Sequence, residues 1–231
     1  MSRTILPLLI AAALLALPRN ATAVSFEKAL VHPDRSAKYL IYLHGAAVET
    51  QGKNASSPRY GVYRYDDIVK YFEDRDLTVI EEVRGQVNPH RYADRVAAEV
   101  RGLMAKGVPA ANITVAGFSK GGHIALLAAS SLNLPDARFA ILAGCGRGLT
   151  AAPYQQFLKH KRGARLAGHI LSVYAVGDLE AGSCAQACGQ HRGPGLRFNE
   201  LPLRSNRGHG LFYVPLPQWA EPVAAFALGG D

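Results

Sequence analysis

The chain has 231 residues, of which 48% are hydrophobic and 19% are charged, and its formal net charge is +8 at pH 7. This composition is typical of one globular domain with a sizeable core and excludes a largely disordered chain, and nothing in the sequence suggests an internal repeat. The basic residues are scattered apart from a cluster over 159–165, which a solvated helix end and a binding patch explain equally well. No motif for DNA or RNA binding is present, so we expect no nucleic-acid partner.

The first residues have the pattern of a secretory signal peptide. A short basic start ends at Arg3, an apolar run follows over 4–17, and Ala21-Thr22-Ala23 is a small-residue cleavage pattern. The apolar run is too short for a membrane-spanning helix, which needs roughly 20 residues. We therefore predict cleavage after Ala23, export to the periplasm or the medium, and a mature single domain over 24–231 with a formal charge of +6 and no membrane span.

Three cysteines in an exported chain leave one thiol without a partner. Cys184 and Cys188 lie close together in the sequence, so a local disulfide between them is the favoured pairing, with Cys145 free and buried. Pairing of Cys145 with Cys184 or Cys188 is the alternative, because loops at neighbouring strand ends can meet. A zinc half-site of Cys184, Cys188 and His191 lacks a fourth ligand at ordinary spacing, and we predict neither a metal nor another cofactor.

Short apolar runs alternate with helical patterns along the mature chain. The runs have the length of buried strands, at 37–43, 77–83, 113–116, 139–143 and 170–176, and residues 197–203 are predicted to form the last strand. Apolar residues recur at helical spacing over 66–75, 92–106 and 123–134. This alternation predicts a doubly wound α/β fold, in which a mostly parallel sheet is flanked by helices on both faces. Ligands of such folds bind beyond the carboxyl ends of the strands, so we expect the functional residues there.

The segment Gly117-Phe118-Ser119-Lys120-Gly121 joins a predicted strand to a predicted helix and has the G-x-S-x-G pattern of a nucleophile elbow. A serine hydroxyl is a weak nucleophile unless it is held rigidly beside a base. Ser119 is therefore the candidate nucleophile. Gly117 and Gly121 meet the steric demand of the turn, because a Cβ at either position would collide with the strand or the helix.

A serine nucleophile needs a histidine as base and an acid that orients the histidine. Asp178 directly follows the strand at 170–176 and is the favoured acid, with Glu180 as the nearby substitute and a simple turn aspartate as the alternative role. His209 lies in a predicted loop after the last strand and is the candidate base. The glycines on both sides of His209 let this loop fold back toward the serine.

Negative charge develops on the carbonyl oxygen during acyl transfer, and two backbone N–H groups must receive it. The candidates for this oxyanion hole are the N–H groups of Ala46 and Lys120. We expect His44 to shape the loop that carries Ala46. The side chain of Lys120 is expected to face solvent, and a contact with an anionic substrate is left open.

Four short motifs occur in the order HG, GFSKG, GD and GHG, and in this order they resemble the α/β-hydrolase superfamily over nearly the whole mature chain. The order Ser119, Asp178, His209 matches the nucleophile, acid and base order of that superfamily. The resemblance implies an acyl-transfer mechanism, in which Ser119 forms an acyl-enzyme and water activated by His209 releases the acyl group.

The sequence departs from the commonest lipase pattern in two ways. Its oxyanion segment is His44-Gly45-Ala46-Ala47 rather than HGGG, and only about 20 residues separate the strand at 139–143 from the next one, so the cap is small or absent. The longest irregular stretch is 47–65. Its three tyrosines either wall the substrate pocket or pack in an ordinary surface loop, and these are Tyr60, Tyr63 and Tyr65.

These features favour an exported serine hydrolase that cleaves a carboxylic ester of a small or accessible acyl substrate. A peptidase or a thioesterase uses the same side chains and is the first alternative. A non-catalytic binding protein with the same fold is the second, because this fold hosts many functions. The substrate and the oligomeric state stay open.

Overall fold

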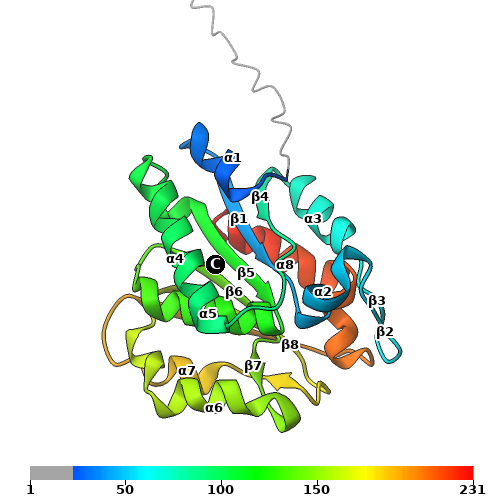
Figure 1. Ribbon diagram of the computed structural model, residues 1–231. Coiled ribbons are helices and arrows are strands. Elements are labelled where there is room, and N and C mark those ends of the chain that lie inside the picture. Colours follow the sequence, from blue (N-terminus) through cyan, green and yellow to red (C-terminus); the bar gives the residue numbers. More distant parts are fainter. Residues whose placement is uncertain (1–22, 231) are drawn as a thin grey trace, which may run out of the picture.

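The computed structural model describes residues 23–230, so the predicted signal peptide lies outside the described residues apart from Ala23. Six strands form one sheet in the order β10-β8-β6-β5-β1-β4, and every pair of neighbours is parallel (Figure 1). The strands are β1 (Lys38–Leu43), β4 (Leu77–Glu81), β5 (Ile113–Phe118), β6 (Arg138–Leu142), β8 (Gly168–Ala175) and β10 (Leu196–Leu203). The predicted fold class is confirmed.

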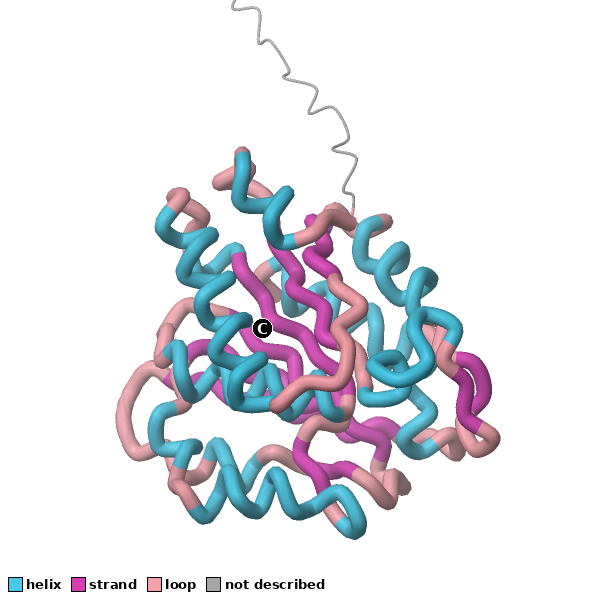
Figure 2. The backbone as a smooth tube through the Cα atoms, in the orientation of Figure 1, coloured by secondary structure: helices cyan, strands magenta, loops and turns pink. Residues whose placement is uncertain are grey.

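Helices cover both faces of the sheet, and alternate residues of each strand face opposite layers (Figure 2). In β1, Ile41 belongs to one core cluster and Tyr42 to the other. The first layer contains α1 (Phe26–Val31), α4 (Pro89–Ala105), α5 (Lys120–Leu132), α6 (Ala151–Lys159) and α7 (Ala185–Cys188), and the second contains α3 (Tyr65–Glu73) and α8 (Pro217–Leu228). No helix among residues 23–230 is long and apolar enough to cross a membrane.

The strands and three of the helices lie where the sequence predicts them, and the ends that differ have local causes. Helix α4 begins at Pro89 rather than at residue 92, because Asn88 caps it by accepting hydrogen bonds from the N–H groups of His90 and Arg91. Helix α5 begins at Lys120, immediately after Ser119, so the predicted nucleophile is the last residue before the helix.

The stretch 47–65, expected to be irregular, is ordered into small elements. It contains α2 (Ala46–Gln51), a 3₁₀ turn (Gly52–Asn54) and a hairpin of β2 (Ser56–Ser57) and β3 (Gly61–Val62). The tyrosines at its end are largely structural, because Tyr63 and Tyr65 are each 1% exposed and belong to the core. Of the two roles left open for the tyrosines, packing rather than lining the pocket therefore applies to these two residues.

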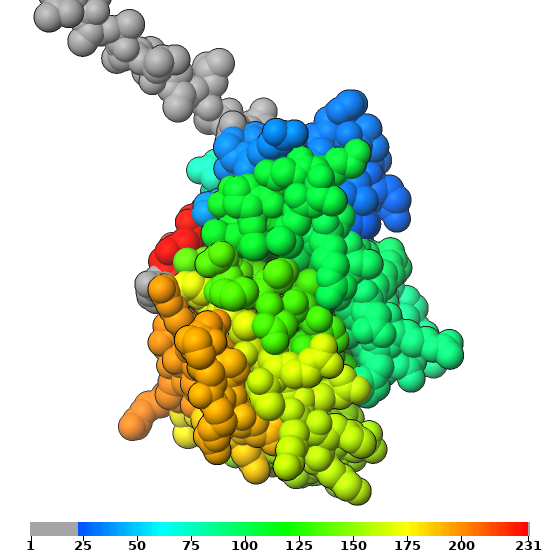
Figure 3. All heavy atoms as spheres, turned by 90° about the vertical axis from the view of Figure 1, so that its left-hand side faces the viewer, coloured from blue at the N-terminus to red at the C-terminus, as the bar shows by residue number. Residues whose placement is uncertain are grey.

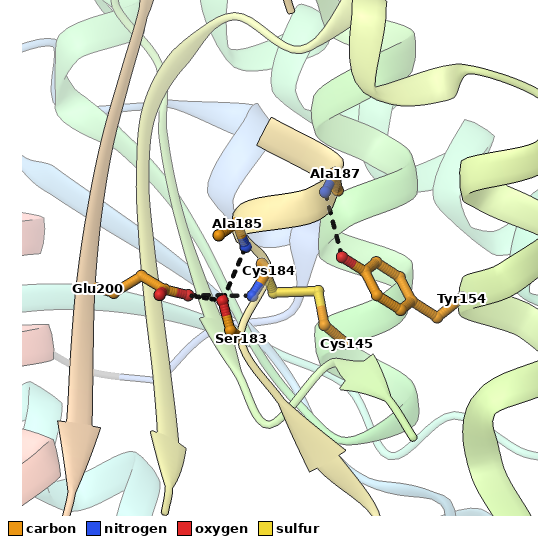
Figure 4. Close-up of a disulfide and its surroundings, with 7 residues drawn as sticks. All are labelled: Cys145, Tyr154, Ser183, Cys184, Ala185, Ala187 and Glu200. Atoms are coloured by element: carbon orange, nitrogen blue, oxygen red, sulfur yellow. Dashed lines mark hydrogen bonds between the residues drawn. A yellow bond between two sulfur atoms is a disulfide. The ribbon is translucent and has the colours of Figure 1, made fainter. Parts of the chain in front are cut away.

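The favoured Cys184–Cys188 disulfide is wrong and the alternative is confirmed, because the structure pairs Cys145 with Cys184 (Figure 4). The short strands β7 (Cys145–Gly146) and β9 (Ala181–Gly182) are antiparallel neighbours, and this brings the two Cα atoms to 5.4 Å. Cys188 ends the single turn of α7 and is a free, buried thiol, and burial raises its pKa to about 12. With its sulfur in a disulfide, Cys184 has no thiolate to offer zinc.

Candidate active site

Ser119 lies on a sharp turn between β5 and α5. Its φ is +55°, in a region that side chains other than glycine rarely occupy, and its N–H donates to the carbonyl of Leu142 at 2.8 Å. A Cβ at Gly117 would lie 2.2 Å from the carbonyl oxygen of Gly121, and one at Gly121 would lie 2.0 Å from that of Leu43. The backbone therefore closes so tightly around Ser119 that only glycine fits at these two positions.

The three residues expected at the carboxyl ends of separate strands lie in contact. His209 Nε2 is 2.9 Å from Ser119 Oγ, and His209 Nδ1 is 2.7 Å from Asp178 Oδ2. A carboxylate accepts and does not donate, so the Nδ1–H of a neutral His209 donates to Asp178 and its Nε2 is free to accept the Ser119 proton. His209 lies on a 3₁₀ helix (Gly208–Tyr213) where the sequence predicts a loop.

Asp178 is held in place on several sides. Its Oδ1 accepts from the N–H of Glu180 at 2.8 Å, and its backbone carbonyl accepts from the guanidinium of Arg147. Glu180, the substitute acid, lies on the opposite side of the imidazole, with Oε2 3.9 Å from His209 Nε2. It accepts a hydrogen bond from the hydroxyl of Tyr60, whose pKa is raised to about 12 by burial and by Glu180. Asp178 alone therefore occupies the orienting position at Nδ1.

The two candidate oxyanion donors lie at helix starts. Ala46 is the first residue of α2 and Lys120 is the first of α5, and N–H groups in a first helical turn have no acceptor within their own helix. A Cβ at Gly45 would lie 3.6 Å from the Cβ of Ser119, so the two helix starts adjoin at the nucleophile. Ala46 and Lys120 line the same cavity as Ser119 and His209.

That cavity has a volume of about 440 Å³ and a mostly apolar lining. One wall comes from the segment between β6 and β8 rather than from the stretch 47–65, and it includes Leu149, Pro153 and Tyr154. Of the three tyrosines in the stretch 47–65, only Tyr60 adjoins the predicted base, with a ring-centroid distance of 6.0 Å to His209.

His44 lies behind the oxyanion segment in a buried hydrogen-bond network that the sequence does not predict. Its Nε2 accepts from the N–H of Arg84 at 3.0 Å, so Nδ1 carries the proton and donates to the carbonyl of Gly45 at 2.9 Å. Burial and the nearby Arg84 lower the pKa of His44 to about 3, which keeps the ring neutral. The guanidinium of Arg84 also donates to the carbonyl of His44. His44 therefore holds the loop, as expected.

The same network contains Glu49, which pairs with two cations. Its Oε1 accepts from Arg84 Nε at 2.8 Å and its Oε2 from Lys120 Nζ at 2.5 Å, and Lys120 also donates to the carbonyl of Val87. The expectation that the Lys120 side chain faces solvent is wrong, because it is 25% exposed and tied to a carboxylate that is 3% exposed. The only sequence clue to Arg84 is its place just after a predicted strand.

His123 is not among the predicted site residues, but the structure places it in the lining of the cavity. It is four residues after Ser119 on α5, it is 7% exposed, and its Nδ1 has no hydrogen-bond partner among the described residues. Burial, and then the positive charges nearby, lower its pKa to about 4, so a neutral imidazole lines the cavity. No group of three or more histidine, cysteine, aspartate or glutamate side chains in residues 23–230 is arranged to hold a metal ion.

The arrangement of the sheet and its flanking helices is shared with solved structures. SOBER1 from Arabidopsis thaliana superposes with a TM-score of 0.54 and 13% identity, over 84% of this chain and 98% of that one. The chain has the α/β-hydrolase fold. Est1E from Butyrivibrio proteoclasticus, solved with ferulic acid bound, has a TM-score of 0.53 and 13% identity over 86% of this chain and 91% of its own.

An acetyl xylan esterase from Paenibacillus sp. R4 is similarly related, with a TM-score of 0.53 and 14% identity over 87% of this chain and 76% of its own. A family model described as Mbeg1-like matches residues 59–141 of this α/β-hydrolase-fold chain. That segment contains Ser119 but neither Asp178 nor His209. No curated protein sequence matches the chain.

Proposed function

We propose that this protein is an exported serine hydrolase that cleaves a carboxylic ester, with Ser119 as nucleophile, His209 as general base and Asp178 as the acid that orients it. The observation that carries the proposal is the unbroken hydrogen-bond chain from Asp178 through His209 to Ser119 Oγ, which lies on a strained turn at the edge of a cavity. Strain of this kind persists only where the surrounding structure enforces it, and it is concentrated at functional sites.

In this mechanism Ser119 Oγ attacks the ester carbonyl while its proton passes to His209 Nε2. The negative charge on the carbonyl oxygen is received by the N–H groups of Ala46 and Lys120. His209 then gives the proton to the departing alcohol, and an acyl-enzyme forms. Water, deprotonated by His209, attacks the acyl-enzyme, and His209 returns the proton to Ser119 Oγ as the acid leaves. Asp178 stabilises the imidazolium in both steps and keeps the ring in the tautomer that accepts from Ser119.

The cavity favours a small, mostly apolar acyl group. Its volume of about 440 Å³ and its mostly apolar lining fit such a group. An acetyl xylan esterase, and Est1E with ferulic acid bound, are among the similar structures, and for this reason ester cleavage is tested first. Peptidase or thioesterase activity, or binding without turnover, is tested by the same experiments.

Export rests on the signal-peptide pattern over 1–23 and on the disulfide between Cys145 and Cys184. Disulfides persist in oxidising compartments, so the pair is consistent with the periplasm or the extracellular medium. The mature protein would then be one domain over 24–231 that acts on a small-molecule or acyl substrate.

The test is hydrolysis of p-nitrophenyl esters of graded chain length by the mature protein beside Ser119→Ala, with Ser56→Ala as an exposed serine control. Ser119→Ala is expected to lower kcat by about 10⁴-fold or more, and the control to leave it unchanged. A fluorophosphonate should label wild type and Ser56→Ala but not Ser119→Ala. Labelling that survives in Ser119→Ala, or wild type that neither reacts nor turns over any ester, amide or thioester, contradicts the proposal.

A further inference from the structure

A second hollow, with a volume of about 520 Å³, lies beside the cavity between α4, α5 and the 3₁₀ turn η4 (Arg162–Arg165). This is the face turned to the viewer in Figure 3, where the green α4 lies above the yellow-green segment that contains α6 and η4. We call the hollow the arginine groove. Its charged and polar lining comprises Arg101, Arg162, Arg165, His90 and Ser131, with Asp94 as the one carboxylate.

The three guanidinium groups of the arginine groove have N–H donors that are not used in hydrogen bonds within the described residues. Among residues 23–230, none of the three forms an ion pair, although each carries five N–H donors. Arg101 makes one bond, to the carbonyl of Ser131 at 3.2 Å. The Nε of Arg162 is buried and has no partner. A buried donor without an acceptor is unfavourable, so the groove is incomplete until an acceptor enters it.

The turn that carries Arg162 and Arg165 is fixed by packing. The N–H of Gly163 donates to the side chain of Gln190 at 3.1 Å, and a Cβ at Gly163 would lie 2.0 Å from the carbonyl oxygen of Ala187. Ala187 lies on α7, next to the Cys145–Cys184 disulfide, and its N–H donates to the hydroxyl of Tyr154 (Figure 4). This turn is therefore a pre-organised structure rather than a loose, solvated helix end.

The arginine groove continues from the candidate active site along α5. Ser119, His123, Leu127 and Ser131 follow one another at intervals of four residues and so share one side of the helix. His123 lines the cavity, whereas Leu127 and Ser131 line the groove. At a rise of 1.5 Å per residue, the groove spans about 12–18 Å from Ser119 along the helix axis.

We propose that the arginine groove binds an oxyanion carried by the non-reacting part of the substrate, while the ester occupies the cavity at Ser119. Guanidinium forks bind carboxylate and phosphate oxygens with two parallel hydrogen bonds, and binding energy from such a remote group favours extended substrates. The assignment of the oxyanion to the substrate rests on the proposed function, whereas anion binding by the groove does not.

Binding is measured with the Ser119→Ala protein, so that turnover plays no part, using oligogalacturonate, a neutral xylo-oligosaccharide of equal length and inorganic phosphate. The test variant is Arg162→Gln with Arg165→Gln, and its matched control is Lys159→Gln with Lys161→Gln, which removes two charges from the same basic segment outside the groove.

We expect oligogalacturonate to bind, the arginine variant to weaken it at least tenfold, and the lysine variant to weaken it less than twofold. Equal weakening by both variants means diffuse attraction to a basic surface and overturns the proposal, as does the absence of binding by both anionic probes. Phosphate that binds as tightly as the chain marks a site for a free anion and overturns the assignment to the substrate.

The kinetic arm compares acetate release from O-acetylated oligogalacturonate and from O-acetylated xylo-oligosaccharide. The arginine variant should lower kcat/KM at least tenfold for the anionic chain, through KM, and leave the neutral chain unchanged. An equal loss on both chains contradicts a role in substrate recognition. If the proposed function is wrong, neither chain is turned over although anion binding persists, so the two failures are distinguishable.

Discussion

Two buried histidines flank the candidate active site, and their surroundings differ. His209 is 6% exposed and lies between a carboxylate and a hydroxyl, those of Asp178 and Ser119. His44 is wholly buried and lies between a carbonyl and a backbone N–H, those of Gly45 and Arg84. Both rings have two partners, but only His209 has partners that allow a proton to arrive and leave.

The charges around each ring decide which role it can take. The carboxylate of Asp178 accepts a hydrogen bond from His209, whereas burial and the guanidinium of Arg84 oppose a protonated His44 and lower its pKa to about 3. The region of Asp178, His209 and Ser119 is therefore suited to proton transfer. The region of His44, Arg84 and Glu49 carries fixed charges and positions the backbone of the oxyanion segment.

Apart from Ser119→Ala, the largest effect should come from removing Asp178, the acid that distinguishes the surroundings of His209 from those of His44. Asp178→Asn keeps the size of the side chain, but an amide can donate a hydrogen bond to Nδ1 as well as accept one. The proton of the imidazole can then move to Nε2, which no longer accepts from Ser119. We expect kcat for an ester to fall about 10⁴-fold, which corresponds to about 5.5 kcal/mol.

Glu180→Gln is the matched control for Asp178→Asn, because Glu180 lies near the opposite ring nitrogen. It should lower kcat by less than about tenfold. A larger loss in Glu180→Gln than in Asp178→Asn would reverse the assignment of the two carboxylates.

The next effect is on stability and concerns the other histidine. Arg84→Met removes the guanidinium that pairs with Glu49 and donates to the carbonyl of His44. Removing one partner of a buried ion pair lowers the free energy of unfolding by about 3–5 kcal/mol. Arg75→Met removes a partly exposed ion pair with Glu221 and should cost about 0–1 kcal/mol. Urea unfolding measures both, and equal losses would mean that the buried network has no special role.

A smaller effect should appear as a loss of stability on acidification. The pKa values of His44 and His123 are lowered to about 3 and about 4, so the unfolded chain binds these protons first and stability falls as the pH drops through 6.5. Glu99 acts in the opposite direction, because burial raises its pKa to about 7 and the folded chain binds that proton first.

Between pH 7 and pH 5 the two histidines together outweigh Glu99, and we expect a net loss of about 1–2 kcal/mol in urea unfolding. Glu99→Gln removes the opposing contribution and should make the loss steeper. Stability that is constant or higher at pH 5 in Glu99→Gln would show that neither histidine is held neutral by the fold.

The contrast between the two regions also explains what the sequence reveals. The sheet can be predicted because its strands are apolar runs of strand length. Ser119 and His209 can be singled out because each is flanked by glycines, which tight turns require. Helix α8 is not foreseen because Pro217 and Pro222 argue against a helix, although Pro217 opens it and burial of Trp219 and its neighbours stabilises the rest.

The network of Arg84 and Glu49, and the disulfide, depend on contacts between segments that are distant in sequence. Arg84 and Glu49 are 35 residues apart, and Cys145 and Cys184 are 39 apart. No local pattern records such pairs, because the partner is chosen by the order of the strands in the sheet. For these two pairs the sequence predicts that the residues lie near strand ends but not which of them meet.

Lys120→Met should give the smallest effect and isolates the side chain from the backbone at this position. The variant keeps the N–H at the start of α5 and leaves Glu49 paired with Arg84, so we expect a loss of about 1 kcal/mol in unfolding free energy and a kcat within about twofold of wild type. Ester hydrolysis with a neutral and an anionic acyl group measures KM for each. A rise in KM confined to the anionic ester would mean that Lys120 leaves Glu49 to bind substrate, and the His44 region would then take part in recognition as well as in positioning.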